Sequence, residues 1–333
     1  MGEVGVQWNA LMSELGMACP DGTMPIVSST WACIAALHYV GKDAGIYLGT
    51  ESEPIFPKGC YEFLFTENLA FVFMNEHETG ALESQSRNFC HQNLEPLPPG
   101  EVVFLGDSDI DFWTTSTDIV PRSLNVGIGG HLCSEVLQDI DSLLEEAKPS
   151  TVVLACGRYD LAQNTTVADT FDLFSNIVDK ISDAGSHVLY LGTKPEPANQ
   201  DLHELYQDYD KLVNDLAISL AEDVADPPLT FIDVYSAFVD LGNPFDLYQG
   251  GDQESLALYG YELWSNWTVA ALEDTDEVPC VVWKSGECVV RSTFSGTASP
   301  IAATTTAEPS PSPSENPTGS PSGSPSAAGI TVT

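Results

Sequence analysis

The sequence predicts an α/β protein with a three-layer α/β/α architecture, in which a doubly wound parallel sheet of the flavodoxin-like type forms the middle layer. Two observations predict it. Apolar runs of five to seven residues recur between residues 101 and 274, and stretches with helically spaced apolar residues separate most of them. Continuous apolar runs are typical of parallel strands buried on both faces, and their alternation with amphipathic helices indicates a layered α/β domain.

The individual elements follow from these patterns in chain order. The five predicted strands are residues 102–106, 124–128, 151–157, 187–192 and 229–235. Apolar residues three or four positions apart predict helices around residues 132–143, 171–181 and 202–220. Thr166 and Asp169 form a predicted capping box ahead of the second helix. Ligands of such sheets bind at the carboxyl ends of the strands, so the residues directly after each strand are candidates for a site.

The chain divides into three predicted regions. Residues 1–94 form a small module with four cysteines, residues 95–290 form the α/β domain, and a proline-rich linker at 95–101 joins the two. Residues 291–333 are rich in Ser, Thr, Pro and Ala, and bury too little apolar surface to offset the entropy of an ordered chain. We expect this last region to be a disordered, O-glycosylated stalk.

Composition excludes two classes of partner. The chain has 49 acidic and 11 basic residues, which gives a formal net charge of -38. Such a surface repels phosphate backbones and anionic lipids, so we expect no nucleic-acid partner and no membrane-surface binding. No apolar stretch approaches the roughly 18 residues of a membrane-spanning helix, which predicts no insertion into a bilayer.

The cysteines favour a secretory route. The chain has eight of them, and no spacing is typical of a zinc site, so disulfides are the better use. Two glycosylation sequons, at Asn164 and Asn266, agree with that route. No signal peptide is visible at the N-terminus. Either the true start of the chain is missing from this sequence, or the protein is cytosolic with free cysteines. The first alternative is favoured and predicts a secreted or cell-surface glycoprotein.

The N-terminal region resembles a known kind of module. It contains "PKGCYEF" and then "LAFVFMNEHETGALES", bracketed by cysteines. These segments are similar to a small cysteine-bracketed module of secreted proteins from algae and other protists. The resemblance implies no chemistry, and a disulfide-pinned, β-rich spacer is the alternative interpretation.

Five segments of the α/β region form a series of motifs: "FLGDSDIDFW", "NVGIGG", "CGRYDL", "GTKPEP" and "LYGYELW". In their order and spacing they resemble the SGNH (GDSL-like) hydrolase family over most of residues 101–270. The resemblance implies an esterase or lipase, with carbohydrate deacetylases among its members, that uses neither metal nor cofactor. It also implies that Ser108 is the nucleophile and that the N–H groups of Ser108 and Gly130 line the oxyanion hole.

Two positions depart from the family pattern. Tyr159 stands where the family has the asparagine that is the third oxyanion donor, and Ser255 stands where it has the catalytic histidine; Asp252, the orienting acid, is retained. A serine hydroxyl is a poor nucleophile until a neighbouring base takes its proton. Loss of the base costs about 10⁶ in kcat, and loss of one oxyanion donor about 10² to 10³. We therefore expect impaired hydrolysis.

Two functional interpretations remain open. The first is a degenerate hydrolase kept as an extracellular binding or structural module. The second is an active secreted esterase or carbohydrate deacetylase that uses Ser108 with an unconventional base. His131, which follows Gly130, is the candidate base, and the alternative is a surface histidine at a helix start. Either interpretation predicts a monomer with a small ester or acylated carbohydrate as its ligand.

Neighbouring polar residues have structural interpretations. Asp107, Asp109 and Asp111 resemble the start of a calcium loop, but Phe112 holds its glycine position, so we expect these aspartates to face solvent or cap a helix. Ser108 is also placed to cap that helix. We expect Lys194 to be solvated. We expect Trp113 and Trp264 to lie in the core. We expect Asp160 and Asp252 to be hydrogen-bonded residues of turns.

Overall fold

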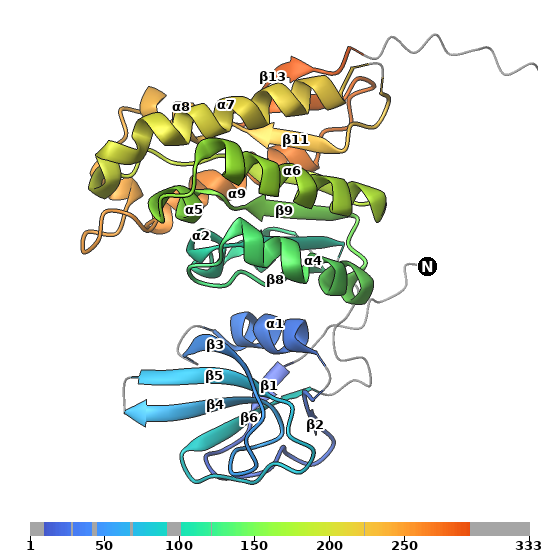
Figure 1. Cartoon of the computed structure of the whole chain (residues 1–333), viewed down its shortest axis with the longest axis vertical. Coiled ribbons are helices and arrows are strands. Elements are labelled where there is room, and N and C mark those ends of the chain that lie inside the picture. Colours follow the sequence, from blue (N-terminus) through green and yellow to red (C-terminus); the bar gives the residue numbers. More distant parts are fainter. Residues whose placement is uncertain are drawn as a thin grey trace, which may run out of the picture. The chain divides into compact units, whose positions relative to one another are not determined.

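Two β-sheets with their helices make up the folded part of the chain (Figure 1). The computed structural model describes residues 10–27, 29–41, 45–66, 69–91, 101–120, 122–222 and 224–293. These residues lie within one compact unit, Met1–Ser295. The predicted linker at 95–100 and the predicted stalk from residue 294 onward lie outside the described residues.

The α/β region is built on a seven-stranded sheet with the order β13-β12-β11-β10-β9-β7-β8. Its strands are β7 (Val102–Gly106), β8 (Ser123–Asn125), β9 (Thr151–Ala155), β10 (His187–Leu191), β11 (Leu229–Ile232), β12 (Cys280–Lys284) and β13 (Glu287–Arg291). Neighbours from β8 to β12 pair in parallel, whereas β13 pairs antiparallel with β12. The sheet is therefore mixed, and five of its strands lie at the predicted apolar runs.

Strands β12 and β13 were not among the five strands that the sequence predicted. Lys284 and Glu287 pair across a two-residue turn in which Ser285 and Gly286 both have positive φ. A turn of this kind matches the twist of an antiparallel hairpin. The Cys280–Cys288 disulfide links the two strands.

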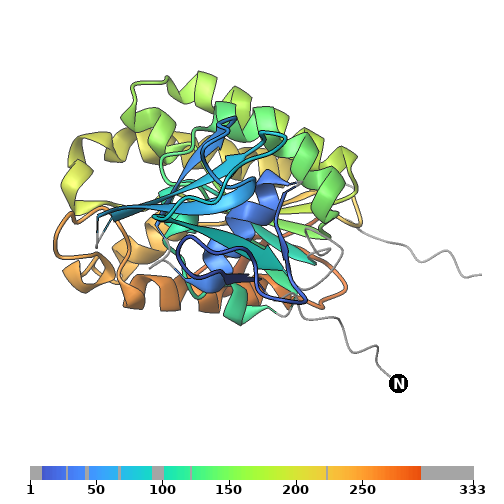
Figure 2. The same cartoon turned by 90° about the horizontal axis from the view of Figure 1, so that it is seen from below.

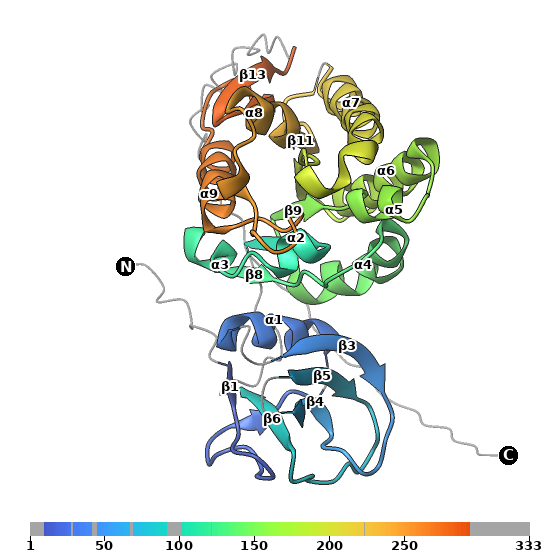
Figure 3. The same cartoon turned by 90° about the vertical axis from the view of Figure 1, so that its left-hand side faces the viewer.

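Helices cover both faces of this sheet (Figure 3). They are α2 (Ser108–Asp111), α3 (Ser116–Ile119), α4 (Cys133–Ala147), α5 (Arg158–Ala162), α6 (Val167–Asp183), α7 (His203–Leu220), α8 (Val234–Asp240) and α9 (Leu258–Leu272), with 3₁₀ turns η2 (Pro197–Leu202) and η3 (Phe245–Leu247). The three longest predicted helices are present as α4, α6 and α7. The hydroxyl of Thr166 accepts a hydrogen bond from the amide of Asp169, as the predicted N-cap requires.

Side chains on alternate positions of a strand enter two separate cores. In β7, Val103 packs into a core that contains residues of α4, α6 and α7, whereas Phe104 packs into one that contains residues of α8 and α9. Trp113 and Trp264 are buried in the second core and meet edge to face, with ring centroids 5.6 Å apart. Their predicted core role is confirmed.

The N-terminal region forms the second sheet, with the order β1-β6-β4-β5-β3 and with β2 paired to β6. Its elements are β1 (Ala10–Met12), β2 (Met24–Pro25), α1 (Thr30–Val40), β3 (Ile46–Glu51), β4 (Gly59–Thr66), β5 (Leu69–Asn75) and β6 (Ser86–His91). Helix α1 packs on one face of this sheet (Figure 2). The Cys19–Cys90 and Cys33–Cys60 disulfides pin the sheet and the helix.

Helix α1 also contacts the α/β region. The indole Nε1 of Trp31 donates a hydrogen bond to Ser142 Oγ at 2.9 Å, and Ser29 Oγ donates to the Glu146 carboxylate. His38 Nε2 lies 3.1 Å from the carbonyl oxygen of Gly127. All seven residues from Trp31 to Leu37 are buried, because both sides of the helix are covered. Within the described residues, no helix is long and apolar enough to cross a membrane.

Candidate active site

Ser108 lies where the chain leaves β7 and enters α2. Gly106 has φ +154°, and a side chain there would place its Cβ 2.1 Å from the carbonyl oxygen of Ala155 in β9, so this position requires glycine. The Asp107 carboxylate accepts a hydrogen bond from the amide of Asp109 at 2.9 Å and caps α2. The sequence prediction that Ser108 could be the cap is therefore wrong, because Ser108 is already the first residue of the helix.

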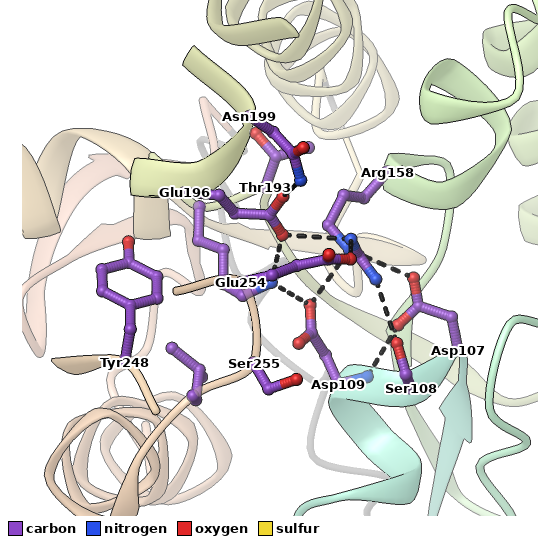
Figure 4. Close-up of polar contacts among 12 residues, drawn as sticks. Asp107, Ser108, Asp109, Arg158, Thr193, Glu196, Asn199, Tyr248, Glu254 and Ser255 are labelled. Atoms are coloured by element: carbon purple, nitrogen blue, oxygen red, sulfur yellow. Dashed lines mark hydrogen bonds and ion pairs between the residues drawn. The ribbon is translucent and has the colours of Figure 1, made fainter. Parts of the chain in front are cut away.

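The hydroxyl of Ser108 faces an arginine (Figure 4). Arg158, the first residue of α5, donates a hydrogen bond from Nη2 to Ser108 Oγ at 3.0 Å. Its side chain is only 5% exposed. Among the described residues, this is the one hydrogen bond of the Ser108 hydroxyl, and its donor is the cation of Arg158.

Asp252, the expected orienting acid, and Ser255, at the position expected for a histidine, bond to each other. Ser255 Oγ donates to Asp252 Oδ2 at 2.8 Å, and Asp252 Oδ1 accepts the backbone amides of Glu254 and Ser255. These bonds hold a polar turn on the surface, as predicted for Asp252. They also hold the pKa of Asp252 below its usual value, because the hydrogen bonds outweigh the modest effect of burial. The hydroxyl that replaces the histidine has no contact with Ser108 in the described structure.

A group of charges, buried except for the partly exposed Glu254, lies at the centre of the site, and we call it the Arg158–Lys194 cluster (Figure 4). It consists of two cations and four carboxylates: Arg158, Lys194, Asp107, Asp109, Glu196 and Glu254. Arg158 Nη1 lies 2.7 Å from Glu254 Oε1 and 3.1 Å from Glu196 Oε1. Its Nε lies 3.4 Å from Asp109 Oδ2 and 3.6 Å from Asp107 Oδ2.

Lys194 completes this cluster and corrects two predictions. Its side chain is 1% exposed, and its ammonium group lies 2.8 Å from Asp109 Oδ2 and also binds Glu196. Lys194 is therefore not solvated, and Asp109 neither faces solvent nor caps a helix with its side chain. A buried lysine and a buried aspartate each need an opposite charge, because water no longer compensates them.

The electrostatics of the cluster keep Arg158 protonated. Burial alone would lower the pKa of Arg158, but Asp107, Asp109 and Glu196 raise it well above its usual value. Burial would raise the pKa of Glu196, yet Lys194 and Arg158 bring it below the usual value. Burial dominates at Asp107 and raises its pKa to about 6. A guanidinium group that keeps its proton cannot take one from Ser108.

Tyr159 packs against the glycine expected in the oxyanion hole. A Cβ atom placed on Gly130, which has φ +77°, would lie 3.6 Å from Cε1 and 3.8 Å from Oη of the Tyr159 ring. The Arg158 guanidinium carbon lies 5.8 Å from the centroid of the same ring. The structure thus brings Tyr159 and Gly130 together, and the phenol ring lies beside the glycine.

His131 is a buried residue, which corrects the prediction of a surface histidine. Its side chain is 7% exposed, and its Nε2 lies 4.0 Å from Asp139 Oδ2, beyond hydrogen-bond distance. Burial lowers its pKa, so the ring is neutral at neutral pH. Within the described residues, Nδ1 has no hydrogen-bond partner. The structure brings His131 near Gly130 along the chain but gives it no contact with Ser108.

Asp160 does have the structural role that its turn predicted. Both oxygens of its carboxylate accept the backbone amide of Cys133, at 3.0 and 3.2 Å, and so satisfy the first turn of α4. Burial nevertheless raises its pKa.

The sequence analysis did not predict the Arg158–Lys194 cluster, although the positions of its residues directly after the strands would have indicated it. Arg158 follows β9, and Lys194 and Glu196 follow β10, whereas Asp107 and Asp109 follow β7. These strands are neighbours in the sheet, so their carboxyl ends meet at one edge. Charges of opposite sign at that edge predict ion pairs. In the part of the chain that the structure describes, no group of three or more His, Cys, Asp or Glu side chains could hold a metal ion.

Comparisons with known proteins find similarity at the level of structure. No protein-family model and no curated protein matches the sequence. The solved structures similar to this chain are lipases and acylhydrolases of the GDSL/SGNH-like kind.

Three of these structures illustrate the extent of the likeness. A member of the lipolytic G-D-S-L family from Veillonella parvula is 14% identical, with 54% of this chain and 98% of that chain covered and a TM-score of 0.44. The lipase/acylhydrolase from Enterococcus faecalis is 21% identical, with 51% and 93% covered and a TM-score of 0.43. An acetyl-xylooligosaccharide esterase from Geobacillus is 13% identical, with 50% and 92% covered and a TM-score of 0.41. Because these identities and TM-scores are low, the function has to be inferred from the residues of the site.

Proposed function

We propose that this protein is a degenerate SGNH-type hydrolase, with impaired or lost ester hydrolysis, that acts as an extracellular binding or structural module. The observation that carries the proposal is the hydrogen bond from Arg158 Nη2 to Ser108 Oγ at 3.0 Å. The guanidinium group of Arg158 occupies a lone pair of Ser108 Oγ, and it cannot accept the proton of the Ser108 hydroxyl.

The arrangement of the other groups supports the same conclusion. Activation of a serine hydroxyl needs a base within hydrogen-bond reach, itself oriented by a third group. Asp252 accepts a hydrogen bond from Ser255 and therefore orients a hydroxyl that cannot act as that base. Tyr159 lies beside Gly130, where an acyl oxygen would have to approach the oxyanion donors. A missing base alone costs about 10⁶ in kcat.

The extracellular part of the proposal rests on three disulfides and two exposed sequons. Disulfides persist in oxidising compartments, and the chain has Cys19–Cys90, Cys33–Cys60 and Cys280–Cys288. Asn164 and Asn266 are both exposed, as glycosylation would require. We assign residues 1–94 to the N-terminal module, 95–290 to a three-layer, flavodoxin-like hydrolase-type domain and 291–333 to a stalk. In this proposal the protein is a monomer, and its ligand is a small ester or acylated carbohydrate.

The alternative is an active secreted esterase or deacetylase with an unconventional base. Glu254 is the group that favours it, because it is partly exposed, lies next to Ser255 and binds the same guanidinium group as Ser108. Its carboxylate, however, binds Arg158 Nη1 at 2.7 Å and makes no hydrogen bond to Ser108 within the described residues.

Hydrolysis of p-nitrophenyl acetate by the full chain distinguishes the two functions. The unchanged protein and Ser108→Ala are compared with a buffer blank at several pH values. Equal rates for the two proteins are the expected result, because no base activates Ser108. A rate that depends on Ser108 would overturn the proposal, and Glu254→Gln would then test the candidate base.

A further inference from the structure

A cavity of about 550 Å³ is lined by residues of the N-terminal region and of the glycine-rich turn at 128–131. Residues of α1, β3, this turn and α4 line it: Thr30, Trp31, Ile34, Tyr47, Leu48, Gly49, Thr50, Ile128, Gly129, Gly130, His131, Glu135, Asp139 and Ser142. A second hollow of about 500 Å³ continues from it and shares Tyr47, Ile128 and Gly129. Ser108 and the Arg158–Lys194 cluster contribute no lining residue to either cavity.

His131 is the first sign that the cavity is a binding site. Its side chain is more than nine-tenths buried, its Nδ1 has no hydrogen-bond partner within the described residues, and the residue lines the cavity. The backbone holds it there, because its amide donates to the carbonyl oxygen of Ile128 across the Gly129–Gly130 turn at 3.1 Å. A buried polar atom without a partner is costly, so a rotation of the imidazole that brings Nδ1 to a ligand in the cavity would be favourable.

Tyr47 provides an independent second sign on the opposite wall. Its Oη is buried and makes no hydrogen bond of ordinary geometry within the described residues, although Thr30 and Thr50 lie close to it. Tyr47 belongs to β3, an edge strand of the N-terminal sheet, and the pairing of β3 with β5 shifts register between Tyr47 and Gly49. Bulges of this kind re-aim side chains and are common beside functional sites.

The lining determines which chemistry fits. Among the described residues that line the cavity there is no lysine or arginine, so nothing there compensates an anionic ligand. The carboxylates of Glu135 and Asp139 accept hydrogen bonds, whereas the hydroxyl of Tyr47 donates. A neutral imidazole at His131 needs one donor and one acceptor. A ligand hydroxyl group both donates and accepts, but an ammonium ion only donates. Aromatic and apolar side chains such as Tyr47 and Ile34 offer a surface for C–H groups.

We propose that this cavity is a binding site for a neutral, hydroxyl-rich ligand, namely one or two sugar units, held by His131, Tyr47 and Asp139 between the N-terminal module and the α/β region. Ser108 does not line the site, although Gly130, the expected oxyanion donor, does, and the binding proposed here needs no reaction at Ser108. It therefore stands whether or not the protein hydrolyses esters, and it gives the N-terminal module a part in ligand binding.

Saturation-transfer-difference NMR on the full chain tests the proposal with free disaccharides as probes: maltose, lactose, cellobiose and xylobiose, each at millimolar concentration. We expect transfer to at least one of them. In Tyr47→Phe, which keeps the ring and loses the hydroxyl, the Kd should rise about fivefold, the value of one neutral hydrogen bond. His131→Ala should weaken binding at least as much.

Tyr259→Phe is the matched control, because Tyr259 is an exposed tyrosine of α9 that does not line the cavity. It should leave the Kd unchanged. Thermal unfolding verifies that each variant is folded, and Tyr47→Phe keeps the test valid if His131→Ala does not fold. The proposal is overturned if none of the disaccharides shows transfer, or if folded Tyr47→Phe binds as tightly as the unchanged protein. Ester hydrolysis is measured separately, so failure of one proposal does not affect the other.

Discussion

Arg158 Nη2 lies 3.0 Å from Ser108 Oγ, so the hydroxyl proposed as the nucleophile is hydrogen-bonded to a permanent cation. The same guanidinium group contacts four carboxylates, and Lys194 joins two of them. The four carboxylates and two cations carry a formal charge of 2 − 4 = −2 when all are ionised. The residues around Ser108 therefore form an ion network in the place where a catalytic triad would need a base.

Removal of Arg158 should destabilise the fold strongly. Arg158→Ala leaves four carboxylates close together with Lys194 as their one remaining cation in the cluster. Breaking a buried ion pair in this way costs about 3–5 kcal/mol of unfolding free energy. Urea unfolding measures the change. Arg122→Ala is the control, because Arg122 pairs with Glu101 on the surface, with both side chains more than half exposed, and should cost under about 1 kcal/mol. Similar losses for the two variants would show that the cluster is not held by Arg158.

Return of the family residues should restore some hydrolysis. In Ser255→His/Tyr159→Asn, the imidazole would lie beside Asp252, which already binds the side chain at 255, and the ring beside Gly130 would be gone. We expect p-nitrophenyl acetate turnover to rise about 10²-fold or more, because a base and an oxyanion donor are both supplied. The same double variant with Ser108→Ala should stay at the blank rate. No gain would mean that Arg158 still prevents Ser108 from reaching a base.

The sequence determined the fold better than the site, for a physical reason. Buried strands such as 102–106 and 187–191 are apolar on both faces, and this property is visible in the residues themselves. The hairpin Cys280–Arg291 was not among the predicted strands, although its Ser285-Gly286 turn is typical of an antiparallel hairpin. For the site, the motif positions located Ser108 and Asp252 on the chain.

Ion pairs at the site depend on the directions in which side chains point. The hydrophobic pattern of a sequence does not contain this information. A lysine is usually solvated, and Lys194 is buried here because Asp109, which follows β7, and Glu196, which like Lys194 follows β10, both bind its ammonium group. His131 was expected on the surface for a similar reason. It is only 7% exposed, and it lines a cavity together with residues of the N-terminal region.

Cys133 and Cys156 should form a fourth disulfide in protein made in an oxidising compartment. They are buried thiols whose Sγ atoms lie 2.6 Å apart, and burial raises both pKa values, which keeps the thiols unreactive in the folded state. Oxidation during folding, with glutathione disulfide as the acceptor of the two electrons, would join them and release two glutathione thiols. Thiol titration of the unfolded, unreduced protein should then find none.

The control for this prediction is Cys133→Ser. This variant should show one thiol per chain, from Cys156, because the other six cysteines are paired. Two thiols in the unchanged protein would show that the pair stays reduced.

Asp210 should make stability depend on pH. Burial raises its pKa from 3.8 to about 7, although Thr193 donates hydrogen bonds to the carboxylate from its amide and its hydroxyl. The folded protein thus holds this proton more tightly than the unfolded chain. The stabilisation is complete below about pH 4 and is lost as the pH rises through 7.

Asp210→Asn imitates the protonated side chain at every pH and keeps an oxygen for the Thr193 amide. The Tm of this variant, relative to the unchanged protein, should therefore increase steadily between pH 4 and pH 8. Asp215→Asn is the control on the same helix, because Asp215 is exposed and its pKa is lowered by its hydrogen bond to Lys211. This control should show no such increase. If the Tm difference for Asp210→Asn were constant over this range, the carboxyl group would be ionised throughout, and burial would not control its charge.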